Sequence, residues 1–188
     1  MKLNLRSLIK PLLLCLLLQA NLTAAEIYEI DTENSIFGFE INNINDGVEA
    51  RVPGKFTKFS GTISFDPETP SASWVEIEVD ASSIDTAIPK RDQHLRSPDF
   101  FNVKEFPTLH FKSKRVKKSG AQTYRIAGHL TLMGITKKVV AECKVTGDAQ
   151  GEVTFHLKRS DYGMTFGLPN TADDVAVKLQ VVGIKKSP

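Results

Sequence analysis

Most of this chain alternates between apolar and polar residues with a period of two, the pattern of β-strands that bury one face. Glycines and an Asp66-Pro67 turn separate several of these segments. The alternation predicts eight strands, near residues 36–41, 59–65, 74–80, 108–114, 123–132, 139–145, 153–157 and 175–181. Each predicted strand has one apolar face, and the sequence offers no long amphipathic helix to cover that face.

A sheet with one apolar face must close on itself or pack against a second sheet. Long strands joined by short turns in sequential up-and-down order favour closure. The sequence therefore predicts an all-β protein built as an eight-stranded antiparallel barrel. Barrels of this size are either filled by side chains or hold one small ligand, and the periodicity alone leaves both alternatives open.

The segment from Ser82 to Ser113 interrupts the strand pattern and is rich in polar and aromatic side chains. Pro89 is placed at a predicted first helical turn, and Ser97-Pro98 reads as an N-cap followed by a proline at the first helical position. Phe106-Pro107 then returns the chain to an extended strand. Long ordered connections in a small β-domain are usually lids or binding loops, so we expect a short helical connector at one mouth of the barrel.

The first 25 residues have the features of a cleaved secretory signal. Lys2, Arg6 and Lys10 are followed by an apolar run over residues 12–18 and by small residues at 23–25. The apolar run is too short to span a bilayer. The sequence therefore predicts a signal peptide over residues 1–25 and one domain over residues 26–188.

Removal of the signal changes the charge balance. Three of the 24 basic side chains lie in the signal, which leaves 21 basic against 22 acidic side chains and a net charge of about −1. This balance gives no indication of nucleic-acid binding. Cys143 becomes the only cysteine, so the mature chain has no intrachain disulfide.

Several short motifs resemble the YceI-like family, the polyisoprenoid-binding, lipocalin-like barrels of the bacterial periplasm. They are Asp85-Thr86, residues 91–97 (RDQHLRS), Asp99-Phe100-Phe101, Phe106-Pro107 before Phe111, residues 54–56 (GKF), residues 59–61 (FSG), residues 128–132 (GHLTL), residues 134–136 (GIT) and residues 159–164 (RSDYGM). The chain departs from the family at Asn102, where an aspartate is frequent. The resemblance implies a periplasmic barrel whose elongated cavity binds an isoprenoid or another long-chain lipid, and it implies no established reaction.

Two sets of residues are candidates for contact with such a lipid. The inward faces of the strands, with Met164 at the mouth, predict a cavity wall of Phe37, Phe39, Ile63, Phe65, Val75, Ile77, Leu109, Phe111, Ile126, Leu130, Phe155, Leu157, Met164, Val177 and Leu179. The connector and the later loop concentrate polar groups, which predicts head-group contacts from Asp85, Arg91, Asp92, His94, Arg159 and Asp161.

The sequence gives little support to a metal site. Alternation places His110, His129 and His156 outward on separate strands, and no two-histidine zinc spacing is present. We therefore expect no metal and no cofactor other than the bound lipid.

The connector aspartates, such as Asp85 and Asp92, could form paired carboxylates for acid–base catalysis. Capping of short turns and ion pairing with arginines explain them without catalysis. The favoured interpretation is a periplasmic, non-enzymatic carrier or store for an isoprenoid such as a quinone. The alternatives are an enzyme that acts on a prenyl or fatty chain through Asp92 and His94, and a stress protein with a filled barrel. Transient membrane contact, through a lysine-rich run over 112–118, and a homodimer are both left open.

Overall fold

The computed structural model describes residues 25–45, 48–147 and 149–186, so nearly all of the predicted signal peptide lies outside the described residues. The strands are β1 (Glu26–Ile30), β2 (Ile36–Asn45), β3 (Val48–Phe56), β4 (Phe59–Phe65), β5 (Trp74–Asp80), β6 (Ile84–Asp85), β7 (Thr108–Lys118), β8 (Thr123–Leu132), β9 (Ile135–Gly147), β10 (Gln150–Lys158) and β11 (Thr171–Lys185). The helical segments are α1 (Pro89–Leu95) and the 3-10 turns η1 (Pro70–Ala72), η2 (Ala81–Ser83) and η3 (Arg159–Tyr162). None of the helices in this part of the chain is long and apolar enough to cross a membrane.

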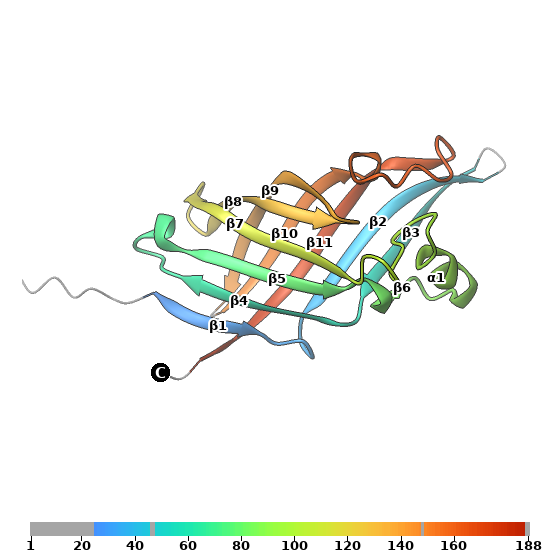
Figure 1. The fold of residues 1–188 in the computed structure, drawn as a ribbon. Helices are drawn as coiled ribbons and strands as arrows, with labels where there is room; N and C mark the ends of the chain where they lie inside the picture. Colours follow the sequence, from blue (N-terminus) through green and yellow to red (C-terminus); the bar gives the residue numbers. More distant parts are fainter. Residues whose placement is uncertain (1–24, 46–47, 148, 187–188) are drawn as a thin grey trace, which may run out of the picture.

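Eight strands close into an antiparallel barrel in the order β1-β4-β5-β7-β8-β9-β10-β11, and β11 pairs with β1 to complete the ring (Figure 1). The predicted eight-stranded closed barrel is therefore confirmed. The closure depends on the length of β11. The C-terminal residues of β11, Gly183–Lys185, pair with β1, while its N-terminal part pairs with β2 from Thr171 to Gln180.

The membership of the ring differs from the prediction. The predicted strand at 36–41 is β2, which lies outside the ring and extends the sheet through β3 to the short β6. The eighth strand of the ring is instead β1, which the sequence pattern did not predict. The order is therefore not simply sequential: the β2–β3 hairpin branches from β11 at one end of the barrel (Figure 1).

The connector lies at that same end (Figure 1). Pro89 occupies the first turn of α1, as predicted, where its missing N–H costs nothing. The second predicted helix, after Ser97-Pro98, is wrong. The N–H groups of Phe100 and Asn102 both donate to the Ser97 carbonyl, and Asn102 has a φ of 44°. A left-handed residue at this point folds the segment into turns and prevents a helix from continuing.

The outward faces of the strands carry ion pairs. The Glu76 carboxylate on β5 lies 3.0 Å from His110 Nε2 and 3.0 Å from Lys112 Nζ, both on β7. His156 on β10 lies 2.7 Å from Asp174 on β11. Both histidines therefore point outward as predicted, and no group of three or more metal-ligating side chains gathers anywhere in the described ranges.

Candidate functional site

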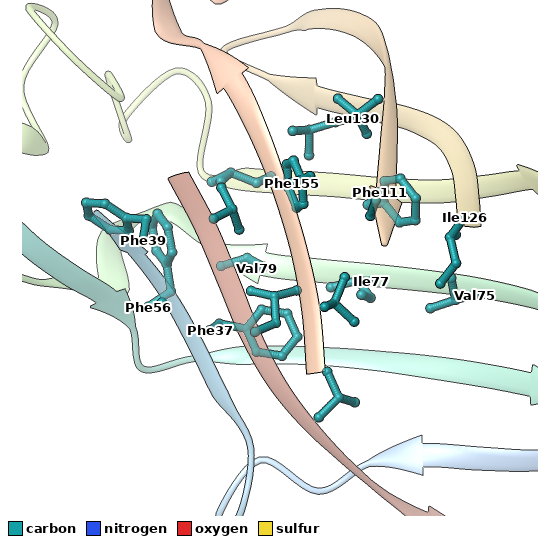
Figure 2. Close-up of a pocket in the computed structure, with 18 of the residues that line it drawn as sticks. Phe37, Phe39, Phe56, Val75, Ile77, Val79, Phe111, Ile126, Leu130 and Phe155 are labelled. Carbon is teal, nitrogen blue, oxygen red and sulfur yellow. The ribbon is translucent and has the colours of Figure 1, made fainter. Parts of the chain in front are cut away.

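The interior of the barrel is hollow. It contains a cavity of about 1100 Å³ whose walls come from every strand of the ring and from β2 and β3. All fifteen residues of the predicted wall line it, and Figure 2 shows Phe37, Phe39, Phe111 and Phe155 among them. The barrel therefore does not have a filled core. The contact of these residues with lipid remains a prediction.

The cavity follows the barrel from end to end. Thr171 and Lys185, the first and last residues of β11, both line it. Fourteen residue steps along a strand correspond to roughly 45 Å of backbone at about 3.3 Å per residue. Strand tilt shortens this along the barrel axis, which still leaves a long space rather than a round one.

Sequence reasoning missed part of the wall. Val79, Leu132, Val153 and Val181 lie on the inward faces of predicted strands, so the same alternation places them in the wall although the predicted set omitted them. Phe56 belongs to β3, which the pattern did not predict. The remaining interior members include Tyr124 on β8 and Val139, Ala141 and Cys143 on β9.

Two glycines make room for aromatic rings in the wall. A Cβ atom on Gly54 would lie 2.3 Å from Cζ of Phe39, and one on Gly128 would lie 2.5 Å from Cζ of Phe111. Any larger residue would collide with these rings. The glycines of the GKF and GHLTL segments are therefore explained by close approach of the neighbouring phenylalanine, which a glycine in a strand often indicates.

Polar groups line the cavity at both ends, with Glu26, Gln150 and Lys185 at one end and a second set at the connector end. Arg91 and His94 of α1 and the preceding Thr86 all line it there, and Arg159 of η3 joins them from the later loop. Arg91 is fixed because its Nε and Nη2 each donate to Thr86, to the hydroxyl and the carbonyl respectively, over 2.8 Å.

The three predicted acidic contacts are placed differently. Asp92 is buried and accepts bonds from the Thr86 amide, over 2.9 Å, and the Thr86 hydroxyl. Asp85 accepts from the Ala87 amide over 2.8 Å, where Ala87 has a φ of 62°. Asp161 lies on the outer surface, beside Lys158 and Tyr162. None of the three is among the described residues that line the barrel cavity. The two in the connector therefore have the local, structural partners that the capping interpretation anticipated.

Arg159 is almost fully buried, and its guanidinium group donates hydrogen bonds to backbone carbonyls. The guanidinium donates to Ala172 over 2.8 Å, to Met164 over 3.0 Å, to Phe166 over 2.7 Å and to Thr171 over 3.0 Å. Burial lowers the pKa of Arg159 from its ordinary value, and the nearby Asp173 carboxylate opposes this. Four of the five N–H groups of the side chain are thus committed to holding the loop between η3 and β11.

An aromatic cluster closes part of the mouth. The His94 ring meets Phe100 at 5.1 Å and Phe166 at 5.0 Å between ring centroids, and Phe100 meets Phe166 at 5.4 Å. These edge-to-face contacts join the connector to the later loop. His94 Nε2 also lies 2.8 Å from the Asp99 carboxylate, so the partner of His94 is Asp99 and not Asp92.

Burial keeps the Cys143 thiol and the Tyr162 phenol neutral. Burial raises the pKa of the Cys143 thiol to about 11, and burial together with Asp161 raises the pKa of Tyr162 to about 12.

At the end of the barrel opposite the connector, Glu26 also lines the cavity and is paired with Lys185. The charge within the lining is therefore positive at the connector end and balanced at the other.

A closed antiparallel barrel around a long apolar cavity is the architecture of lipocalin-like ligand-binding proteins. The model of the YceI-like domain family matches residues 28–183. A UPF0312 protein of Yersinia enterocolitica is 33% identical over 181 residues, which cover 90% of this chain and 92% of the Yersinia protein. This chain belongs to the YceI-like domain family.

Solved structures have the same fold. BcnA of Burkholderia cenocepacia superposes with a TM-score of 0.75 at 23% identity, covering 81% of this chain and 98% of BcnA. The YceI protein of Campylobacter jejuni gives a TM-score of 0.66 at 25% identity, with 74% and 87% covered. A polyisoprenoid binding domain from Saccharophagus degradans, implicated in plant cell wall breakdown, gives 0.63 at 15% identity, with 85% and 98% covered.

Proposed function

We propose that this protein binds an isoprenoid or another long-chain lipid inside the barrel and serves as a periplasmic carrier or store for it. The observation that carries the proposal is the long apolar cavity of about 1100 Å³. Membership of the YceI-like family and the polyisoprenoid binding domain of Saccharophagus degradans support the same class of ligand. The signal-like features of residues 1–25 support export.

The polar head of the ligand belongs at the connector end. Arg91 and Arg159 line the cavity there, whereas Glu26, the carboxylate among the lining residues, is at the opposite end. Arg91 uses only two of its five N–H groups on Thr86, and arginine has no acceptor, so the connector end suits a head rich in acceptors, such as a quinone carbonyl or a phosphate. The tail then extends along the phenylalanines and valines towards Trp74.

Binding, rather than catalysis, fits the side chains at this mouth. An acid–base centre would need Asp92 and His94 to act together, but Asp92 is bonded to Thr86 and His94 to Asp99. A net hydrogen bond contributes about 0.5–1.5 kcal/mol, while each buried methylene of a tail contributes roughly 0.8 kcal/mol. The tail therefore provides most of the affinity and the head mainly provides selectivity.

The test is a competition between lipids that share one chain length and carry carbonyl, alcohol, amide or phosphate heads. Arg91→Ala should change the ranking of the heads while the protein still retains lipid. Arg96→Ala is the matched control, because Arg96 donates to the carbonyls of Ser82 and Ile84 within the same connector. Arg96→Ala should lower thermal stability and leave the ranking unchanged. An unchanged ranking in folded Arg91→Ala protein would remove the head-group role.

A further inference from the structure

Basic side chains gather on one side of the barrel. The neighbouring strands β7, β8 and β9, with the turns that join them, span residues 108–147 and carry nine lysines and arginines against one acidic residue, Glu142 (Figure 1). The rest of the predicted mature chain, residues 26–107 and 148–188, carries 12 basic and 21 acidic side chains. A net charge of +8 on three strands therefore stands against −9 on the remainder. We name this surface the basic face, and it consists of Lys112, Lys114, Arg115, Lys117, Lys118, Arg125, Lys137, Lys138 and Lys144.

The fold makes these charges neighbours on the outside of the barrel. All nine side chains are exposed. The strand register places Lys112 of β7 opposite His129 of β8, and His129 opposite Lys138 of β9, so that a basic row crosses the sheet. A bulge in β7 leaves two consecutive basic residues, Lys114 and Arg115, exposed together.

Most of these charges are not neutralised within the protein. Lys112 pairs with Glu76 on β5, and it is the only member of the basic face with an ion pair among the described residues. Charges of one sign repel, which opposes the folded state. Lysines often protect an exposed sheet edge from pairing with another chain, but β7, β8 and β9 each have a paired strand on both sides. Edge protection therefore does not explain the basic face, and its charges are available to an anionic partner.

The composition of the basic face distinguishes between anionic partners. Protein interfaces are depleted of lysine and enriched in aromatic residues, and single-stranded nucleic acids stack their bases on aromatic side chains. The basic face has seven lysines, whereas the phenylalanine and the tyrosine of these strands, Phe111 and Tyr124, line the cavity. Lysine is a flexible point charge and not a planar fork for one phosphate. It therefore suits a surface of many phosphates without fixed geometry, which is what an anionic bilayer presents.

The basic face also adjoins the lipid cavity. The pairing of β9 with β10 ends at Glu142 and Thr154, although each strand continues to pair with its other neighbour. A groove of about 330 Å³ lies on the outer side of the unpaired ends. Val139 and Leu157 line both this groove and the cavity, so that one layer of side chains separates the two. The titratable groups that line the groove are Lys137, Lys138, His156, Lys158, Asp161, Tyr162 and Asp174.

We propose that the basic face docks the barrel on a bilayer that contains anionic phospholipid, which brings the groove between β9 and β10 beside the membrane. Charge complementarity carries the proposal, and the closeness of the apolar cavity favours a lipid partner over other polyanions. Docking does not itself require the proposed function, but loading of the cavity from the docked position rests on it.

Co-flotation with vesicles of phosphatidylcholine mixed with phosphatidylglycerol tests the docking. One triple variant neutralises lysines of the basic face: Lys114→Gln, Lys117→Gln and Lys138→Gln. The matched control removes the same charge from exposed lysines on other elements: Lys55→Gln, Lys90→Gln and Lys178→Gln. Each basic residue near an anionic surface contributes about fivefold to affinity, so the first triple variant should bind about a hundredfold more weakly and the control should stay close to wild type. Equal losses in the two triple variants, both folded by their melting curves, would overturn the proposal.

Salt and lipid composition separate this docking from other modes of attachment. Binding should be lost at about 1 M salt, where the Debye length is about 3 Å, and pure phosphatidylcholine vesicles should not bind. Equal affinity for pure phosphatidylcholine would mean apolar insertion and would overturn the proposal. Duplex DNA or poly-glutamate that displaces the protein at a lower charge concentration than unlabelled anionic vesicles would make a nucleic acid or an acidic protein the partner, which would also overturn it.

The orientation of the docked barrel has its own readout. A fluorophore is attached to Val140→Cys, within the basic face, or to Ile184→Cys on β11, both in a Cys143→Ser background; the two native side chains are 49% and 57% exposed. Anionic vesicles should protect the fluorophore at position 140, but not the one at 184, from quenching by acrylamide, a neutral quencher. Equal protection at the two positions would show that the basic face does not direct the docking.

The docking and the proposed function can fail separately. Lipid in the purified protein without affinity for anionic vesicles would remove the docking and leave the proposed function intact. Vesicle binding by a protein that takes up no lipid would do the reverse. If both hold, the triple variant of the basic face should carry as much lipid as wild type at equilibrium but take it up from dilute anionic vesicles about a hundredfold more slowly, in line with its reduced vesicle affinity.

Discussion

A single inward substitution, Ala141→Trp, should shorten the cavity without damaging the fold. Ala141 is the seventh of the thirteen residues of β9, so it lies near mid-height in the barrel. It is 4% exposed and lines the cavity. Its neighbour Val140 faces outward and is 49% exposed, which makes Val140→Trp a control of the same size and chemistry one residue away.

The effect on affinity follows from the tail that the indole displaces. Each buried methylene contributes roughly 0.8 kcal/mol, which is about fourfold in affinity. Excluding only three methylenes would therefore cost about 2.4 kcal/mol, or about sixtyfold. Short lipids that reach only the connector half of the barrel should bind wild type and Ala141→Trp equally. Longer homologues should gain affinity in wild type and reach a plateau early in the variant.

Stability provides a second reading of the same substitution. In a filled core, a side chain this much larger would cost about 1–3 kcal/mol through overpacking. In a cavity of about 1100 Å³ the indole has room, so the free energy of unfolding of the lipid-free protein should be unchanged or higher. The assays are calorimetric titration with a homologous lipid series and urea unfolding of delipidated protein. Identical chain-length curves for Ala141→Trp and Val140→Trp, or a large loss of stability in Ala141→Trp alone, would refute the reasoning.

Three further substitutions or probes test particular parts of the wall and mouth. Arg159→Lys keeps the charge but cannot make four hydrogen bonds from one planar group, so it should lower the free energy of unfolding by about 2–3 kcal/mol. Arg125→Lys, on the outer face, should not lower it, and equal melting curves for the two variants would contradict this. Gly128→Ala should cost about 1–3 kcal/mol by displacing Phe111, whereas Gly147→Ala, whose Cβ would meet nothing closer than 3.6 Å, should cost little in the same unfolding assay. Alkylation of Cys143, followed by peptide mass spectrometry, should be slow at pH 8 because burial keeps the thiol protonated, and its rate should rise about tenfold per pH unit towards the pKa of about 11. Bound lipid should slow the alkylation further. A rate like that of a free cysteine that does not change with lipid would show that Cys143 does not face the cavity.

Alternation was enough to predict the barrel, because a one-sided sheet with no covering helix has to close. It could not predict β3. The apolar residues Val48, Val52 and Phe56 recur every four positions, and Pro53 and Gly54 are unfavourable within strands. The strand forms because Phe39 covers Gly54 from β2, so the glycine takes the place of an inward apolar residue. That contact exists only once the hairpin is folded.

The polar site was less predictable than the wall for a related reason. A residue belongs to the wall because it lies on the inward face of a strand, and the alternation of apolar and polar residues in the sequence shows which face that is. The partners of Asp92 and Arg159 are set by how a loop returns over its own helix or turn. Asp92 reaches back to Thr86, and Arg159 reaches forward to carbonyls as far as Ala172. A charged residue beside a cavity and a charged residue that ties a loop look the same in a sequence.

Lipid occupancy is tested most directly by native mass spectrometry of the protein purified from its native host, followed by organic extraction. We expect an intact protein carrying one long-chain lipid that extraction removes and that fragmentation identifies as an isoprenoid. We also expect that Ala141→Trp, expressed in the same way, carries less of that lipid or shorter homologues, while Val140→Trp carries the wild-type complement. Wild-type protein that emerges without lipid, or with the same lipids at the same occupancy as Ala141→Trp, would contradict the claim that the barrel cavity is a lipid-binding site.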